Sequence, residues 1–289
     1  MSTAFDNSWQ ALLKPGKTTH YFNITYPAIE LDTPGFSVAN ALWLAELSRL
    51  IYRRDSEETA KPLQAPRRTE LLSAVALTET RFFSQGATQC ALLETSKPEC
   101  AVLVFRGSHE VDNWFTNFNT WAVAWPEGGR VHQGFKKSFE QIWDSIEYCL
   151  VRLKKPIFYT GHSLGAALAT LAAVKRPPLA LYTFGSPRVG NAAFATLFQT
   201  IRAYRVVNYR DWVTRLPFEF IHFRHVGELH YITHEGLLLT QPSPQMIAAQ
   251  SRARQRQHYP RRVWFEPPTA LAAHSPVNYV AHLEHILLN

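Results

Sequence analysis

The segment Gly161-His162-Ser163-Leu164-Gly165 constrains the fold most, because it places a serine between two glycines where a strand meets a helix. Before it, Pro156 to Tyr159 is a short apolar and aromatic run, and after it leucines and alanines recur at helical spacing. This is the context that the nucleophile-elbow pattern G-x-S-x-G requires. Such a turn exposes the serine Oγ and points the first amides of the helix at it, where they stabilise an oxyanion. The segment therefore predicts a serine nucleophile at the edge of a sheet.

Length and composition favour one large domain. The chain has 289 residues, of which 46% are hydrophobic, so a single α/β domain over 1–289 can bury a sizeable core. The sequence has no uncharged apolar run of about 18 residues, and its first residues do not resemble a signal peptide. Its three cysteines are an odd number without metal-ligand spacing, which permits a reduced protein. We therefore expect a cytoplasmic protein.

The net charge of +7 raises the question of an anionic partner. Aromatic and basic residues are not interleaved as a nucleic-acid-binding surface requires, so we expect no nucleic acid partner. Much of the excess charge lies in a run of arginines at positions 252, 254, 256, 261 and 262. This run is typical of a solvated loop, and the alternative is attraction to anionic lipid head groups.

Strand and helix patterns alternate along the chain and predict a mostly parallel sheet flanked by helices. A continuous apolar run, Ala101 to Phe105, predicts a strand buried on both faces. The remaining expected elements are helices over Val38–Tyr52, Phe135–Leu153, Ala192–Ile201 and at the C-terminus, strands over Leu179–Phe184 and Tyr204–Tyr209, hairpins over Thr80–Leu93 and Phe220–Glu235, and a loop over Gln241–Pro268.

The polar residues Ser108, Ser163, Ser186 and Asp211 each follow an expected strand. Because ligands bind at the carboxyl ends of parallel strands, we expect these residues to lie at one edge. A serine nucleophile needs a histidine base oriented by a carboxylate, which follow in the order serine, acid, histidine in this type of fold. Asp211 is the only aspartate after Ser163 and follows a clear strand, although five later glutamates remain formal competitors.

The histidine is less constrained by the sequence. His274 precedes an amphipathic terminal helix, in a loop where its ring can be presented freely, and it is favoured on position alone. The other candidates after Asp211 are His222, His225, His230, His234, His258, His282 and His285.

The chain resembles the class 3 lipase family, the group of the filamentous-fungal triacylglycerol lipases. The matching segments are Asn40-Ala41 to Tyr52, Phe105-Arg106-Gly107-Ser108, His132-Gln133-Gly134-Phe135, Gly161 to Gly165, Phe184 to Asn191 and Arg205 to Pro217. The sequence departs from the family at Ala166, where glycine is usual, at Ala273, where aspartate is common, and at Tyr279, which lies further along than in many members.

The resemblance implies an α/β-hydrolase fold with Ser163 as nucleophile, Asp211 as acid and His274 as general base. It also implies an oxyanion hole from the amides of Ser108 and Leu164, with help from the Ser108 hydroxyl. A short lid helix is implied within about 108–125, where Trp114, Phe115 and Phe118, with Trp121 and Trp125 behind them, form either an interfacial patch or part of the core.

The predicted activity is hydrolysis of carboxylic esters, acylglycerols foremost, through an acyl-enzyme and without a cofactor. The expected partners are a lipid ester substrate and, transiently, the lipid–water interface; the oligomeric state is left open. One alternative is a non-catalytic lipid-binding protein with the same fold. The other is a metal-dependent hydrolase using His222, His225, His230 and His234 with Glu228, although no H-E-x-x-H motif occurs.

Overall fold

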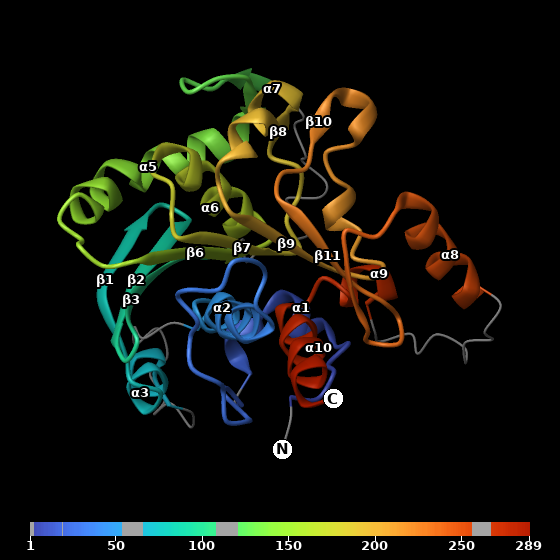
Figure 1. Cartoon of the computed structure of the whole chain (residues 1–289), viewed down its shortest axis with the longest axis horizontal. Coiled ribbons are helices and arrows are strands. Elements are labelled where there is room, and N and C mark those ends of the chain that lie inside the picture. The colour runs from blue at the N-terminus through green and yellow to red at the C-terminus, as the bar shows by residue number, and fades with distance from the viewer. Residues whose placement is uncertain (1–2, 19, 54–65, 108–120, 256–266) are drawn as a thin grey trace.

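The computed structural model describes residues 3–18, 20–53, 66–107, 121–255 and 267–289 (Figure 1). Its central sheet has eight strands in the order β1-β2-β3-β6-β7-β9-β11-β12. The strands from β3 to β11 run parallel, and β1, β2 and β12 add antiparallel at the two edges. A smaller sheet has the order β10-β8-β5-β4. The predicted mostly parallel sheet is therefore confirmed.

The described strands are β1 (Leu77–Gln85), β2 (Thr88–Ser96), β3 (Glu99–Phe105), β4 (Ala122–Ala124), β5 (Arg130–His132), β6 (Ile157–His162), β7 (Ala180–Phe184), β8 (Gly190–Asn191), β9 (Ala203–Asn208), β10 (Phe223–Arg224), β11 (Glu228–Ile232) and β12 (Leu238–Thr240). The described α-helices are α1 (Trp9–Leu13), α2 (Val38–Leu50), α3 (Arg68–Ala74), α5 (Gln133–Leu150), α6 (Leu164–Lys175), α7 (Ala192–Ala195), α8 (Pro244–Gln255), α9 (Thr269–Ala272) and α10 (Pro276–Leu288).

Helices cover both faces of the central sheet, with α5 and α6 on one side and α2 and α10 on the other (Figure 1). Strand β3 illustrates the two cores. Val102 and Val104 belong to the cluster on the α2 face, whereas Leu103 and Phe105 belong to the cluster on the α5 face. Because successive side chains of a strand point to opposite faces, a strand covered on both sides must be apolar throughout.

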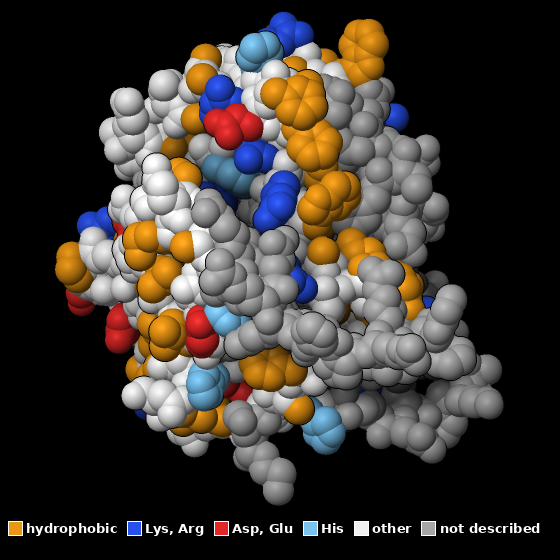
Figure 2. All heavy atoms as spheres, turned by 90° about the vertical axis from the view of Figure 1, so that its right-hand side faces the viewer, with side chains coloured by type: hydrophobic (Ala, Val, Ile, Leu, Met, Phe, Trp, Pro, Cys, Tyr) orange, Lys and Arg blue, Asp and Glu red, His pale blue; other side chains and the backbone are white. Residues whose placement is uncertain are grey.

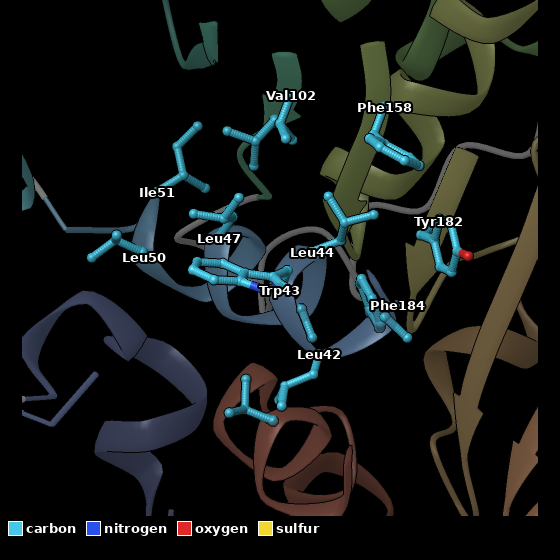
Figure 3. Close-up of a cluster of buried hydrophobic side chains, with 14 of the residues drawn as sticks. Leu42, Trp43, Leu44, Leu47, Leu50, Ile51, Val102, Phe158, Tyr182 and Phe184 are labelled. Atoms are coloured by element: carbon cyan, nitrogen blue, oxygen red, sulfur yellow. The ribbon is translucent and has the colours of Figure 1, made fainter. Parts of the chain in front are cut away.

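Helix α2 packs against the central sheet and positions the residues that follow it. Figure 3 shows Leu44 and Leu47 pointing from α2 towards the strand residues Val102 and Phe158, while Leu42 lies on the side of α10. Each fully buried leucine contributes about 1.5–3 kcal/mol to the free energy of unfolding. This packing holds the C-terminal end of α2, and with it Tyr52, against the sheet.

Three sequence-based expectations were wrong. The region Phe220–Glu235 is not a hairpin, because β10 joins the smaller sheet beside β8 and β11 pairs in parallel with β9. Alternating hydrophobicity indicates a strand but does not specify its partner. Part of the expected loop Gln241–Pro268 is helix α8, and the helix expected over Ala192–Ile201 ends at Ala195 and continues as a 3₁₀ turn over Thr196–Gln199.

The expected lid region, about 108–125, falls mostly outside the described residues, which resume at Trp121. Trp121 is 70% exposed, but Trp125 is buried against Phe139 and Phe194, so it belongs to the core and not to an exposed patch. The arginine run also lies largely outside the described part of the chain. None of the helices described is long and apolar enough to cross a membrane.

Candidate active site

Ser163 lies at the tight turn between β6 and α6, where the elbow was predicted. Its backbone has φ 59° and ψ −125°, in the positive-φ region that side chains rarely adopt. The flanking glycines allow close approach of the backbone. A Cβ at Gly161 would lie 2.7 Å from the amide nitrogen of Ala166, and a Cβ at Gly165 would lie 2.8 Å from the carbonyl carbon of Phe105. Only glycine fits both positions without shifting the backbone.

Asp211 and His274 form a buried hydrogen-bonded pair beside this turn. The Nδ1 atom of His274 lies 2.8 Å from Oδ2 of Asp211, and both side chains are almost fully buried. The other carboxylate oxygen of Asp211 accepts a hydrogen bond of 2.9 Å from the amide of Val213. The carboxylate therefore holds the proton of His274 on Nδ1 and leaves Nε2 available as a base.

The Nε2 atom of His274 is buried and has no hydrogen-bond partner among the described residues. A buried imidazole nitrogen without a hydrogen-bond partner destabilises the folded protein unless another group, such as a substrate or a reacting hydroxyl, bonds to it. The loop that carries it is fixed from behind, because the side-chain amide of Asn208 donates to the carbonyl of Ala273 at 3.0 Å. Nε2 of His274 is therefore held in place and available to bond to a reacting group.

Tyr279 is a site residue to which the sequence analysis assigned no role. Its hydroxyl donates to Oδ2 of Asp211 at 2.6 Å and accepts from the amide of Asn208 at 3.1 Å. The only available sequence signal was its unusual spacing from His274. In the structure this spacing places Tyr279 on the inner side of α10, where it supports the carboxylate directly.

Of the two residues expected to form the oxyanion hole, the structure describes Leu164 but not Ser108. Leu164 is the first residue of α6, so its amide is among the four helix N–H groups that have no partner one turn back. Ser108 lies outside the described residues. The strand that leads to it, β3, ends at Phe105, which pairs with Gly161 beside the elbow.

The other histidines after Asp211 lie in different surroundings. Among those proposed as metal ligands, His225 donates to the carbonyl of Thr214 at 2.8 Å, and His230 stacks on Phe36 with ring centroids 3.6 Å apart. Nδ1 of His234 lies 3.0 Å from the amide oxygen of Gln250. Within the described ranges, no group of three or more histidines, cysteines or carboxylates could hold a metal ion. His258 is not among the described residues.

Part of the chain is similar to known lipases. The family model described as "Lipase (class 3)" matches residues 102–221. The chain is 39% identical over 152 residues to the secreted mono- and diacylglycerol lipase 1 of Fusarium solani. That alignment covers 48% of this chain and 45% of the relative, so the chain spans less than half of the relative's length.

Two solved structures are similar over larger parts of the chain. A fungal lipase–inhibitor complex, described as a model for interfacial activation in lipases, is 30% identical with a TM-score of 0.52, over 58% of this chain and 71% of that one. A triacylglycerol lipase whose catalytic centre is described as a serine protease triad is 25% identical with a TM-score of 0.54, over 70% and 80%. The fold is therefore the expected α/β-hydrolase fold.

The expectation of a cytoplasmic protein was wrong, because the Fusarium solani relative is named as a secreted enzyme. The expectation rested partly on unpaired cysteines, which do not identify a compartment. Cys90 and Cys100 are fully buried, and burial raises the pKa of the Cys100 thiol to about 11. A buried thiol that stays protonated resists oxidation and does not require a reducing environment.

Proposed function

Because the chain belongs to the class 3 lipase family, we propose that it is a serine hydrolase that cleaves carboxylic esters, with acylglycerols as its main substrates. The observation that carries the proposal is the hydrogen bond of 2.8 Å between His274 and Asp211, which leaves Nε2 of His274 unpaired next to the elbow that presents Ser163. Both core clusters flank one sheet, which supports treating residues 1–289 as one catalytic domain.

The proposed reaction proceeds through an acyl-enzyme. Nε2 of His274 takes the proton of Ser163 as Oγ attacks the ester carbonyl carbon, and the amides of Leu164 and Ser108 stabilise the oxyanion. His274 then gives this proton to the departing alcohol oxygen, which leaves an ester on Ser163. Water attacks that ester while His274 takes its proton, and the proton returns to Oγ as the carboxylic acid leaves. This sequence needs no cofactor.

An exposed row of aromatic side chains supports a lipid surface as the site of action. Trp212, directly after Asp211, and Phe218 are each about 40% exposed, and Phe220 is 78% exposed. The ring centroids of Trp212 and Phe218 are 6.4 Å apart, and those of Phe218 and Phe220 are 5.3 Å apart. Exposed apolar groups gathered in this way are typical of interaction sites.

Arginines accompany this aromatic row. Arg188 donates to the carbonyl of Pro217 at 3.1 Å, and Arg224 donates to the carbonyl of Glu219 at 2.9 Å. Arg215 lies in the same segment. The exposed carboxylate of Glu219 forms ion pairs with Arg188 and Arg224. Figure 2 shows basic side chains gathered next to hydrophobic ones on this side of the molecule. We therefore expect contact with lipid–water interfaces, and preference for anionic ones.

The decisive experiment compares two buried serines at the same edge of the sheet. Ser163→Ala should reduce turnover of tributyrin and of p-nitrophenyl butyrate by on the order of 10⁴-fold while the melting temperature is kept. Ser186→Ala is the matched control, because within the described residues its hydroxyl donates only to the carbonyl of Pro187, at 3.0 Å. Wild-type turnover by Ser163→Ala, with or without loss in the control, would overturn the proposal.

The substrate class is tested by initial rates on esters of graded chain length, below and above their solubility limits. A jump in rate when the substrate forms a separate phase supports acylglycerol surfaces as the target. A smooth saturation curve through that limit would instead identify an esterase of dissolved substrates.

A further inference from the structure

A second series of hydrogen bonds reaches His274 at its backbone carbonyl, whereas Asp211 bonds to its ring. The side chain of His162, the residue before Ser163, lies with Nε2 2.7 Å from the carbonyl oxygen of His274. Its Nδ1 lies 3.1 Å from the hydroxyl oxygen of Tyr52, in the turn that follows α2. Both side chains are at least 95% buried, so these contacts are shielded from water.

The chemistry of the partners fixes the direction of each hydrogen bond. A carbonyl oxygen only accepts, so Nε2 of His162 carries the proton and donates to His274. The Nδ1 atom of the neutral ring then accepts, and the hydroxyl of Tyr52 donates to it. The Tyr52 oxygen accepts in turn from the backbone of Gly107. Burial raises the pKa of this hydroxyl well above its usual value, and the charge of Arg106 and the hydrogen bond from Gly107 offset only part of that rise.

These hydrogen bonds connect four segments whose relative positions matter for the reaction. Gly107 lies directly before Ser108, and Tyr52 lies two residues after helix α2, which packs on the sheet. His162 belongs to the elbow, and His274 carries the base. At Gly107 an added Cβ would collide with the Tyr52 hydroxyl, which shows how closely these segments approach. Each hydrogen bond therefore fixes one segment relative to the next.

We propose that His162 and Tyr52 are positioning residues that hold the main chain of His274 relative to Ser163 and to Gly107. Asp211 orients the ring of His274 through Nδ1, whereas His162 fixes its backbone through the carbonyl. The inference rests on the proposed function, because it assumes that His274 is the base acting on Ser163.

The charge of His162 matters as well as its geometry. Its ring centroid lies 4.5 Å from that of His274. Burial, and the proximity of His274, hold the pKa of His162 well below its usual range, so the ring is neutral at working pH. When His274 takes the serine proton it becomes a cation, and a neutral neighbour that donates to its carbonyl does not oppose this charge. A histidine with a depressed pKa supplies a rigid, neutral donor at this position.

The test compares His162→Leu, which removes both hydrogen bonds, with His162→Gln, which keeps a neutral donor. Turnover of p-nitrophenyl butyrate is measured as kcat and KM and divided by the concentration of sites titrated with a phosphonate ester, so that only folded, reactive protein counts. We expect kcat to fall about 10–100-fold in His162→Leu with KM within about twofold, because misplacement of a reacting group acts on the transition state. His162→Gln should recover most of this loss.

Tyr52→Phe and a matched control complete the design. Tyr52→Phe removes one hydroxyl from the chain and should lower kcat by about 3–10-fold, which keeps the proposal testable if His162 variants fold poorly. Ser48→Ala is the control: the Ser48 hydroxyl lies 3.0 Å from that of Thr160 and also joins α2 to β6, but this hydrogen bond is separate from those of His162, Tyr52 and His274. It should keep the wild-type kcat.

Two results would overturn the proposal while the proposed function stands: wild-type kcat in His162→Leu and Tyr52→Phe, or an equal loss in Ser48→Ala. If the wild-type protein neither turns over esters nor reacts with the phosphonate, the proposed function itself fails and the positioning role fails with it.

Discussion

Replacing Gly185 with alanine would disturb the Asp211–His274 pair without altering either side chain. Gly185 follows β7 and has φ +58°, and a Cβ there would lie 2.8 Å from Oδ2 of Asp211 and 2.9 Å from Nδ1 of His274. Ordinary van der Waals contact begins at 3.4 Å, so the pair must move by about 0.6 Å. The new methyl group therefore acts directly on the geometry that we regard as essential.

The size of the effect follows from this displacement. A misplacement of about 1 Å can cost on the order of 10²-fold in rate, so we expect kcat to fall by about 10–100-fold, or about 1.4–2.7 kcal/mol in the barrier. The positive φ costs a further 1–2 kcal/mol, roughly, in the free energy of unfolding. Gly236→Ala shares this backbone cost, at φ +84°, but its Cβ would lie 3.4 Å from the nearest atom, in His285, which is ordinary contact.

The assay measures kcat on p-nitrophenyl butyrate and the melting temperature for both variants. We expect both variants to lose a similar amount of stability, and only Gly185→Ala to lose kcat. If Gly185→Ala kept kcat within twofold of Gly236→Ala, His274 held by Asp211 would not be the catalytic base.

Three further outcomes are expected. Burial lowers the pKa of His282 to about 4, whereas the unfolded value is about 6.5, so stability that is full above pH 6.5 should fall by about 3 kcal/mol as the pH drops towards 4. Urea titrations should show this loss in the wild type and a flatter pH dependence in His282→Phe. Phe220→Ser should weaken sedimentation with phosphatidylglycerol vesicles by about tenfold, whereas Val151→Ser, which removes another exposed apolar side chain, should bind normally. Tyr279→Phe removes a donor to Asp211 and should lower the free energy of unfolding by about 2–3 kcal/mol and kcat by about tenfold; an unchanged kcat would limit this hydroxyl to a structural role.

Local patterns in the sequence were enough to predict much of the fold and part of the candidate site. The continuous apolar run in β3 predicted burial on both faces, and the elbow motif predicted the strand–turn–helix around Ser163. Asp211 could be proposed because no other aspartate follows Ser163, and because it comes just after a strand. These features depend on residues close together in the sequence.

Features that depend on distant pairs could not be predicted in this way. Tyr279 and Asp211 are 68 residues apart, and Tyr52 and His162 are 110 residues apart, so no spacing pattern connects them. The same reason explains the error at β11, whose alternating residues indicate a strand whether its partner is the β10 segment, as expected, or β9 and β12, as observed. Partner choice is decided by packing over the whole sheet.

The central claim is that Ser163 is the nucleophile of an ester hydrolase, and covalent labelling tests it most directly. The intact chain is treated with a p-nitrophenyl alkylphosphonate, and the mass of the protein and of its peptides is measured together with residual tributyrin turnover. We predict one adduct per chain, on the peptide that contains Ser163, appearing in step with loss of turnover, and no adduct in Ser163→Ala. An adduct on another residue, or full turnover in the labelled protein, would contradict the account.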